Sequence, residues 1–402
     1  MSGSEDRIRR LLSAAAVRER GHEMLETALA GGVEGWRVDL ARLDAAADLT
    51  AAVTREQYPD LAIPFHARWR HFLAGEPRLP DAPAERGRAA FDLVILSVLL
   101  DAGAGPGWSY RDAQSGLTLG RSEGLAVASQ RLFESGAFSA DPGSPLRADG
   151  EALGSLSDDG LVRGFQVDEV NPMVGLEGRS ALLRRLGSQV LARPDLFAAQ
   201  DSPRPGGLFD VLAARAEAGR LPAPAILALL LEALGPIWTG RLTLEGIPLG
   251  DCWRHPALRR DDETDGLVPL HKLSQWLAYS LIEPLQDAGI AVTDMDGLTG
   301  LAEYRNGGLF VDTGVLVLTD PQDASRSHRV EEPLIVAWRS VTVALLDRLA
   351  PLVRERLGVG ERDFPLARML EGGTWLAGRR IAAERRADGG PPFTILSDGT
   401  VF

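Results

Sequence analysis

A cluster of charged and polar residues near position 300 has the composition of a catalytic site. It spans ten positions and contains Glu303, Arg305, Asn306 and Asp312. Gly307 and Gly308 split the cluster, and glycine readily takes the left-handed conformation that closes a helix. We therefore expect a short helix that begins near Asp296 and ends at these glycines.

Glu303 would lie in the last turn of that helix, next to the negative end of the helix dipole. This position disfavours the ionised carboxylate and raises its pKa. A carboxyl group of this kind suits acid–base or electrostatic catalysis. The alternative is that Glu303 and Arg305 are ordinary charges at the end of a helix.

A second cluster, of aromatic and cationic residues, follows two prolines that interrupt any helix. It contains His66, Arg68, Trp69, Arg70 and His71. Arginine binds phosphate through paired hydrogen bonds and tryptophan stacks on bases, so the cluster predicts an anion- or base-binding wall. Alternatively, the arginines pair with the acidic surface and Trp69 packs in the core. No third ligand stands at metal-ligand spacing from the two histidines, so we expect no metal.

A lysine stands beside aromatic residues in the segment 267–286. Leucines at helical spacing predict a helix there, with Lys272, Trp276 and Tyr279 on another face. Such a lysine is a candidate for a partly desolvated amine or a phosphate anchor. An ordinary solvated lysine is the alternative.

The glycine-rich segment Gly103–Gly107 follows an apolar run and imitates a dinucleotide-binding loop. That motif needs a helix directly after its glycines. The sequence WSYRD that follows does not begin a helix, so we reject a dinucleotide site. Trp108, Tyr110 and Arg111 instead predict the rim of a pocket, or a surface turn plugged by aromatic rings.

The segment Gly120–Gly124 matches G-x-S-x-G, which in α/β-hydrolases exposes a nucleophilic serine between a strand and a helix. The chain lacks the alternating strands and helices of that fold. The simpler interpretation is that Ser122 caps a helix, with Glu123 in its first turn. A serine hydrolase that uses Ser122, with His328 and Asp312 as partners, remains an alternative.

Length, net charge and cysteine content limit the class of protein. Its 402 residues exceed the usual single core, which predicts two lobes. A formal net charge of −13 argues against nucleic acid and against docking on an anionic membrane. The single cysteine, Cys252, excludes a disulfide within the chain and favours the cytoplasm. The sequence shows neither a signal-peptide core nor an apolar run of about 20 residues.

Apolar periodicity predicts helices over most of the chain. The expected helices cover 5–30, 38–54, 180–192, 209–219, 222–235, 267–286, 331–358 and 364–386, the last broken at Gly372–Gly373. The sequence of residues 391–402 predicts a β-hairpin with Asp398–Gly399 at its turn. We expect a mostly α fold of two interlocked helical lobes with minor short β hairpins. The glycine- and proline-rich connection 141–174 suggests a boundary between lobes 1–175 and 176–402.

Several long motifs resemble one family. YPDLAIPFHARWRHF, WSYRDAQSG, GRSEGLAVASQRLF, GLEGRSALLRRLG and EYRNGGLFVDTGVL are similar to the uracil-catabolism protein 4 family, long described as a domain of unknown function. The resemblance covers roughly Trp36 to the C-terminus. It implies a role in a uracil degradation route that passes through a nucleotide and a ring-opened ribosylurea-type intermediate.

A more distant likeness suggests a mechanism. PLHKLSQWLAYSL, LTGLAEYRNGGLFVDTGVL and VEEPLIVAWRSVTVALLDRL resemble, in order and spacing, the queuosine-salvage nucleoside glycosidases, which are all-helical and related to helix-hairpin-helix DNA glycosylases. Lys272 stands where those enzymes carry a characteristic lysine, and Glu303 where they carry the catalytic aspartate of an ADYR-like motif. Glutamate replaces aspartate here and NGG follows the arginine, so the reach of the carboxylate differs.

The predicted reaction is hydrolysis of the N-glycosidic bond of a ribosylurea-type compound or a ring-opened uridine nucleotide, without metal or cofactor. The carboxylate is Glu303, with Asp312 as second choice, and the cations are Lys272 and Arg305. The remaining substrate-binding residues are His66, Arg68, Trp69, Trp108, Tyr110, Arg121 and Asn306. Alternatives to this reaction are the serine hydrolase or amidase, an amidohydrolase acting on the urea group, and a non-catalytic partner of a ring-opening enzyme.

Overall fold

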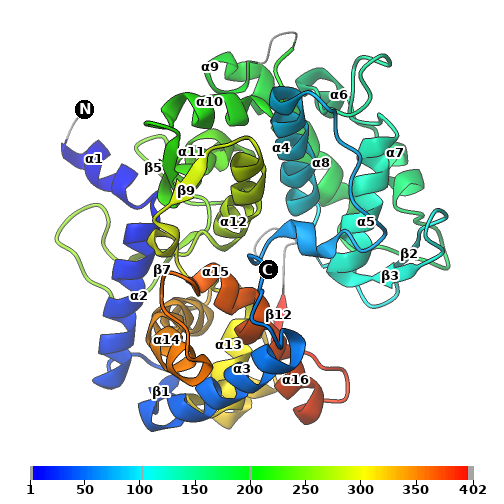
Figure 1. The fold of residues 1–402 in the computed structure, drawn as a ribbon. Coiled ribbons are helices and arrows are strands. Elements are labelled where there is room, and N and C mark those ends of the chain that lie inside the picture. Colours follow the sequence, from blue (N-terminus) through cyan, green and yellow to red (C-terminus); the bar gives the residue numbers. More distant parts are fainter. Residues whose placement is uncertain (1–2, 102, 199–201, 397–402) are drawn as a thin grey trace. The chain divides into compact units, whose positions relative to one another are not determined.

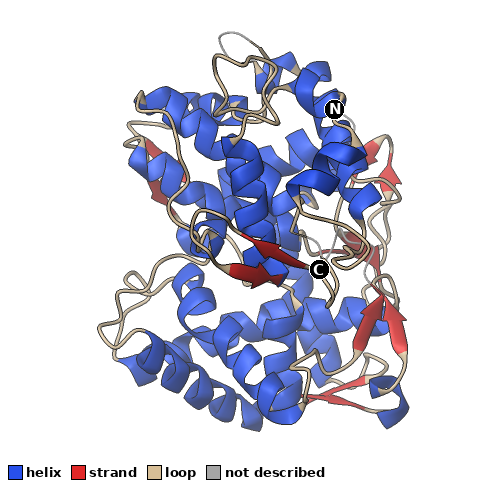
Figure 2. Cartoon of the chain, turned by 90° about the vertical axis from the view of Figure 1, so that its right-hand side faces the viewer, coloured by secondary structure: helices blue, strands red, loops and turns tan. Residues whose placement is uncertain are grey.

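The protein is mostly α, with strands only in small two-stranded sheets, as Figure 2 shows. The computed structural model describes residues 3–101, 103–198 and 202–396. The chain divides into two compact units that are each assembled from separated segments. The first unit contains 3–66, 241–275 and 294–396, and the second contains 67–240 and 276–293. Residues 175 and 176 both belong to the second unit, so the predicted division into 1–175 and 176–402 does not follow these units. The glycine- and proline-rich connection that suggested it folds into short helices within that unit.

The first unit is built around the longest helix of the described chain. Its helices are α1 (Gly3–Arg10), α2 (Ala14–Leu29), α3 (Leu43–Gln57), α13 (Tyr304–Asp312), α14 (Pro333–Leu357), α15 (Leu366–Met369), a π-helix (Leu370–Thr374) and α16 (Trp375–Arg385), with 3-10 turns at Leu40–Arg42, Met295–Gly297 and Pro321–Ala324. The helix α14 is buried along its length and packs against α2, α3 and α13 (Figure 1). Pro333 in its first turn and Gly358 in the left-handed conformation at its end bound it, as helix-end chemistry favours.

Short strand pairs complete the first unit. Antiparallel pairs join β1 (Trp36–Val38) to β10 (Leu316–Leu318), β5 (Thr243–Leu244) to β6 (Ile247–Pro248), and β7 (Cys252–Arg254) to β8 (Leu267–Pro269). The strands β11 (Ser327–Arg329) and β12 (Thr394–Leu396) pair in parallel. The predicted hairpin turn at Asp398–Gly399 lies outside the described residues.

Two helical predictions in the first unit need correction. The expected single helix over 5–30 is divided into α1 and α2, because the Ser13 hydroxyl accepts a hydrogen bond from the N–H of Ala16 and starts a new helix. The helix over 364–386 is not broken at Gly372–Gly373. These glycines lie inside the π-helix, which continues directly into α16.

The second unit surrounds a buried helix, α4, which packs against α5, α8 and α10. Its helices are α4 (Pro83–Leu99), α5 (Arg121–Glu134), α6 (Gly150–Gly154), α7 (Asp158–Gly164), α8 (Leu176–Ala192), α9 (Pro194–Phe197), α10 (Gly207–Arg215) and α11 (Ala223–Leu234), with 3-10 turns at Arg68–His71 and Gly235–Ile237. The strands β2 (Ser109–Arg111) and β3 (Thr118–Gly120) are antiparallel, whereas β4 (Arg220–Pro222) and β9 (Ala291–Thr293) are parallel. The helix α12 (Lys272–Asp287) begins in the first unit and continues in the second. No helix in the described residues has the length and apolarity to span a membrane.

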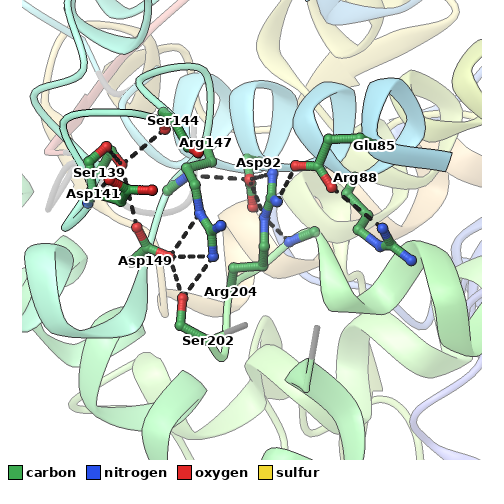
Figure 3. A network of polar contacts seen from close by, with 12 residues as sticks. Glu85, Arg88, Asp92, Ser139, Asp141, Ser144, Arg147, Asp149, Ser202 and Arg204 are labelled. Carbon is green, nitrogen blue, oxygen red and sulfur yellow. Dashed lines mark hydrogen bonds and ion pairs between the residues drawn. The ribbon is translucent and has the colours of Figure 1, made fainter. Parts of the chain in front are cut away.

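A buried polar network ties loops of the second unit to α4 (Figure 3). Asp92 is fully buried on α4, and its carboxylate binds Nε of Arg204 at 2.8 Å and the backbone N–H of Gly206 at 2.6 Å. It also accepts a hydrogen bond from the N–H of Ala148 at 3.1 Å. Arg204 reaches Glu85 as well. A buried charge is tolerated only when it is paired and hydrogen-bonded, and this arrangement fixes two loops that carry little regular structure.

Candidate active site

Glu303 directly precedes α13, and its carboxylate caps the first turn of that helix. Oε2 accepts a hydrogen bond from the N–H of Arg305 at 2.7 Å, and Oε1 accepts one from the N–H of Asn306 at 2.6 Å. The predicted location in the last turn of a helix is therefore wrong. Glu303 lies at the positive end of a helix that begins after it.

The glycines that were expected to end a helix lie inside α13. A Cβ atom at Gly307 would stand 2.6 Å from the ring of Trp338 on α14. Glycine at this position therefore permits the close contact of two helices. This contact joins α13 to a helix that follows later in the chain, so local sequence rules did not anticipate it.

The environment of Glu303 raises its pKa. Its side chain is almost completely buried, and the loss of hydration disfavours the charged form. The charge of Lys272, the two backbone N–H donors and the charge of His66 act in the opposite direction, but burial outweighs them. The predicted direction of the shift is confirmed, and burial rather than the helix dipole causes it.

Lys272 is the first residue of α12, and a buried ion pair fixes its backbone. Its N–H donates to Oδ2 of Asp251 at 3.0 Å, and Asp251 binds both terminal nitrogens of Arg339 at 2.8 Å. Nε of Arg339 donates to the carbonyl of Ala302 at 3.1 Å. One ion pair thus anchors both the start of α12 and the residue that precedes Glu303.

The residue before Lys272 is held in an unusual conformation. His271 has φ of +47°, a region that residues other than glycine rarely adopt. Its ring is buried, and Nε2 bonds the carbonyl of Leu11 at 2.8 Å. Strain of this kind persists only where surrounding contacts enforce it, and here it directs the chain into the lysine.

Removing the charge of Asp251 is expected to lower stability in a pH-dependent way. Burial alone would raise the pKa of this carboxyl, but Arg339, the indole N–H of Trp253 and the N–H of Lys272 hold it below its usual range. Because the pKa is lower in the folded than in the unfolded state, the ionised carboxylate stabilises the fold above about pH 4, and this contribution is lost as the pH falls below that value. Asp251→Asn should reduce the free energy of unfolding by about 2 kcal/mol at pH 7.

Urea denaturation of the wild type and Asp251→Asn between pH 7 and pH 3.5 measures this effect. The difference in free energy of unfolding between the two proteins should become smaller below about pH 4. Asp261→Asn, at an exposed position of the same unit, controls for the loss of a negative charge. A difference that stays constant over the whole pH range would contradict the assigned role of the Asp251 charge.

His66 is paired with Glu371, a residue that the sequence did not suggest as part of the site. Nδ1 of His66 lies 2.7 Å from Oε2 of Glu371, and both side chains are largely buried. The charge of His66 acts on Glu303, so the first unit gathers Glu303, Lys272 and His66. Glu371 was missed because it stands in an ordinary helical pattern. The signal that marks it is the pair of glycines directly after it, within that helix.

Arg305 and Asn306 join the site mainly through their backbone. The guanidinium of Arg305 donates from Nη1 to the carbonyl of Gly389 at 2.8 Å and stands 4.6 Å from the ring centre of Tyr304. The amide of Asn306 donates to the carbonyl of Leu301 at 3.2 Å. Both side chains are buried in structural contacts, whereas their N–H groups orient the carboxylate.

Asp312 does not lie next to the carboxylate of Glu303. It ends α13, the helix that Glu303 begins, and it forms a two-pronged ion pair with Arg386 at 2.8 and 2.6 Å. A helix of this length separates its two ends by about 13 Å. Asp312 therefore serves as an anchor for Arg386.

The other predicted binding residues belong to the second unit. Arg68 is completely buried, where Nη1 binds Asp101 at 2.8 Å and the Ser122 hydroxyl at 2.9 Å, and Nε binds Ser97 at 2.7 Å. Burial lowers the pKa of Arg68. Its hydrogen-bond partners Ser97, Asp101 and Ser122 are protein side chains, which is the pattern of a buried structural arginine.

Ser122 neither caps α5 nor has a histidine among its hydrogen-bond partners in the described residues. Its hydroxyl donates to Asp101 at 2.7 Å and accepts from Arg68, while α5 begins after Gly120 without a side-chain cap. The interpretation of Ser122 as a helix cap is therefore wrong. His328 belongs to the first unit, where its ring bonds Glu332 and a backbone carbonyl.

Trp69 is held by a break in a helix. Pro284 inside α12 has no N–H, so the carbonyl of Ser280 one turn earlier lacks its helical donor. The indole N–H of Trp69 donates to this carbonyl at 2.7 Å. Trp69 also lines a cavity of about 590 Å³ together with Arg70 and Glu283.

Trp108, Tyr110 and Arg121 lie on or next to the β2–β3 strand pair of the second unit. The ring of Trp108 is buried and donates to the carbonyl of Phe165 at 2.9 Å. Tyr110 is buried on β2, and its burial raises the pKa of the phenol. Arg121 is exposed and has φ of +53° at the start of α5. Trp108 therefore has the contacts of a packing residue and not those of a pocket rim.

The sequence is similar to a described family and to two named relatives. Residues 10–402 match a family model described as a protein of unknown function, DUF1688. The chain is 39% identical over 416 residues to "Protein urg3" of Schizosaccharomyces pombe, covering 99% of this chain and all of that protein. It is 36% identical over 433 residues to "Uracil catabolism protein 4" of Lachancea kluyveri, covering 97% of this chain and 98% of the relative.

Proposed function

The chain belongs to the DUF1688 family, and from this premise we propose that it acts in uracil catabolism as an N-ribosyl hydrolase. Its substrate is a ribosylurea-type compound, which water splits into ribose and urea. The name of the relative from Lachancea kluyveri supports the pathway. The buried free thiol of Cys252 is compatible with the cytoplasm as the compartment.

The buried carboxylate of Glu303 carries the proposal for the reaction. Cleavage of a glycosidic bond passes through an oxocarbenium-like state, which a nearby carboxylate stabilises. The helix N–H groups of Arg305 and Asn306 fix both oxygens of Glu303. A raised pKa also makes the ionised group a stronger base toward the attacking water. The positive charge of Lys272 favours the ionised form of this carboxyl.

Incubation of the purified protein with ribosylurea and with its 5′-phosphate tests the proposal, with ribose, ribose phosphate, urea and ammonia followed by mass spectrometry. Equal release of urea and the sugar from either compound is expected, and the better substrate defines whether a phosphate is needed. Release of ammonia with an intact C1′–N bond would replace this function by amide hydrolysis of the urea group. Tight binding without turnover would identify a non-catalytic partner of a ring-opening enzyme.

A further inference from the structure

The pair formed by His66 and Glu371 has the geometry of an acid–base group. Nδ1 of His66 and Oε2 of Glu371 are 2.7 Å apart, and their side chains are 6% and 12% exposed. When Nδ1–H donates to the carboxylate, the proton that the ring exchanges is the one on Nε2. The carboxylate orients the ring, as in other histidine–carboxylate pairs.

The histidine is held on two further sides. Its backbone N–H donates to the carbonyl of Ala367 in α15 at 2.9 Å. The ring centre of Trp375, the first residue of α16, lies 6.0 Å from that of His66. These contacts and the bond to Glu371 restrict the rotation of the imidazole, so its position is defined in advance of any substrate.

Glu371 lies in the π-helix, and the packing of this segment requires a glycine. A Cβ atom at Gly373 would stand 2.6 Å from the side chain of Thr50 and 2.8 Å from that of Thr54, both on α3. A single π-helical turn is uncommon and is often found at functional sites. Here it shifts Glu371 out of the regular α-helical register while α16 continues the helix.

The same helical segment approaches Glu303. A Cβ atom at Gly378 on α16 would come within 2.2 Å of the carbonyl oxygen of Arg305, so α16 packs tightly against the first turn of α13. Glu371 stands two turns earlier, about 10 Å along the helix. The charges that act on Glu303 include Lys272 and His66, and Glu371 faces His66 from the π-helix. The site thus contains two carboxyl groups and two cationic or protonatable groups.

We propose that His66, positioned by Glu371, is the acid that protonates the departing urea; this rests on the proposed hydrolysis. The C1′–N bond breaks and its electron pair goes to the nitrogen, which takes the proton from Nε2 of His66. The oxygen of water bonds C1′, and its proton passes to Glu303. Ribosylurea and water give ribose and urea, and solvent returns the proton from Glu303 to His66. Urea departs poorly as an anion, so the reaction requires such an acid.

Variants of His66 and Glu371 test the inference with two substrates. The first is ribosylurea. The second is 4-nitrophenyl riboside, whose leaving group 4-nitrophenolate departs as a stable anion and needs no acid. His66→Gln should lower kcat on ribosylurea about 100-fold and kcat on the nitrophenyl riboside less than about fivefold. Glu371→Gln should show the same selectivity with a loss of about tenfold on ribosylurea. Asp312→Asn, at the far end of α13 where the carboxylate binds Arg386, should change both rates by the same factor.

The outcomes separate this inference from the proposed function. A wild-type protein that releases no urea from ribosylurea refutes the proposed function itself. A wild type that releases urea, with His66→Gln equally impaired on both substrates, refutes only the role of His66. If the wild type does not accept the nitrophenyl riboside, the ¹⁵N kinetic isotope effect on the hydrolysis of ribosylurea tests the role of His66. This isotope effect should be larger in His66→Gln than in the wild type, because the nitrogen then departs unprotonated. An unchanged isotope effect overturns the inference.

Discussion

Glu303→Gln is expected to slow the release of urea from ribosylurea by about 1,000-fold. In the proposed reaction, the substitution removes the charge that stabilises the oxocarbenium-like state and the base that accepts a proton from water. The fold should persist, because the glutamine carbonyl still accepts one of the two hydrogen bonds from the first turn of α13. The loss of the other bond should reduce the free energy of unfolding by about 1 kcal/mol. Steady-state kinetics and urea denaturation measure the two effects.

Asp312→Asn provides the matched comparison for this variant. It removes the same charge from the opposite end of α13, where the carboxylate binds Arg386. The rate on ribosylurea should fall less than tenfold, in contrast to the effect at Glu303. Full activity of Glu303→Gln, or a larger loss in Asp312→Asn, would show that the carboxylate has been assigned to the wrong residue.

Asp92→Ala is expected to destabilise the protein by about 3–5 kcal/mol, because it breaks a buried ion pair from one side. Arg204 is 1% exposed and would keep its charge in an apolar interior, with Glu85 as its remaining carboxylate partner. The N–H groups of Gly206 and Ala148 would lose their acceptor. Urea denaturation at neutral pH measures the change, and a loss below about 1 kcal/mol would contradict the role of this pair.

The half-exposed ion pair beside it serves as the control. Asp210 binds Arg88 from α10 with two hydrogen bonds, and its side chain is 35% exposed. Asp210→Ala should therefore cost less than about 1 kcal/mol. The difference between Asp92→Ala and Asp210→Ala isolates the effect of burial from that of charge.

The sequence predicts Glu303 and Lys272 as site residues but does not predict the surroundings of their side chains. Helix-end rules predict that Gly307 closes a helix, whereas glycine is required there by the ring of Trp338 on another helix. The direction of the pKa shift at Glu303 follows from burial, which depends on packing among segments that are distant in the sequence. Apolar periodicity succeeds for α14, because the apolar face of one helix is a local property of the sequence.

Residue type alone does not separate a binding wall from a buried polar network. Arg68 stands next to aromatic residues and prolines, as a phosphate-binding arginine does, yet its guanidinium binds Asp101, Ser122 and Ser97. Glu371 presents the opposite case. Its role depends on His66, which lies far away in the sequence, and on a π-helical turn that no propensity rule anticipates.

The segmented composition of the first unit has a consequence for synthesis on the ribosome. His66, Lys272, Glu303 and Glu371 come from three separate stretches of that unit. Most of α16 and the π-helix emerge only after nearly the whole chain has been translated, at about 5–20 residues per second. An early-terminated chain therefore holds His66 without its carboxylate partner and Glu303 without its neighbours. Incomplete products of translation should consequently lack the assembled site.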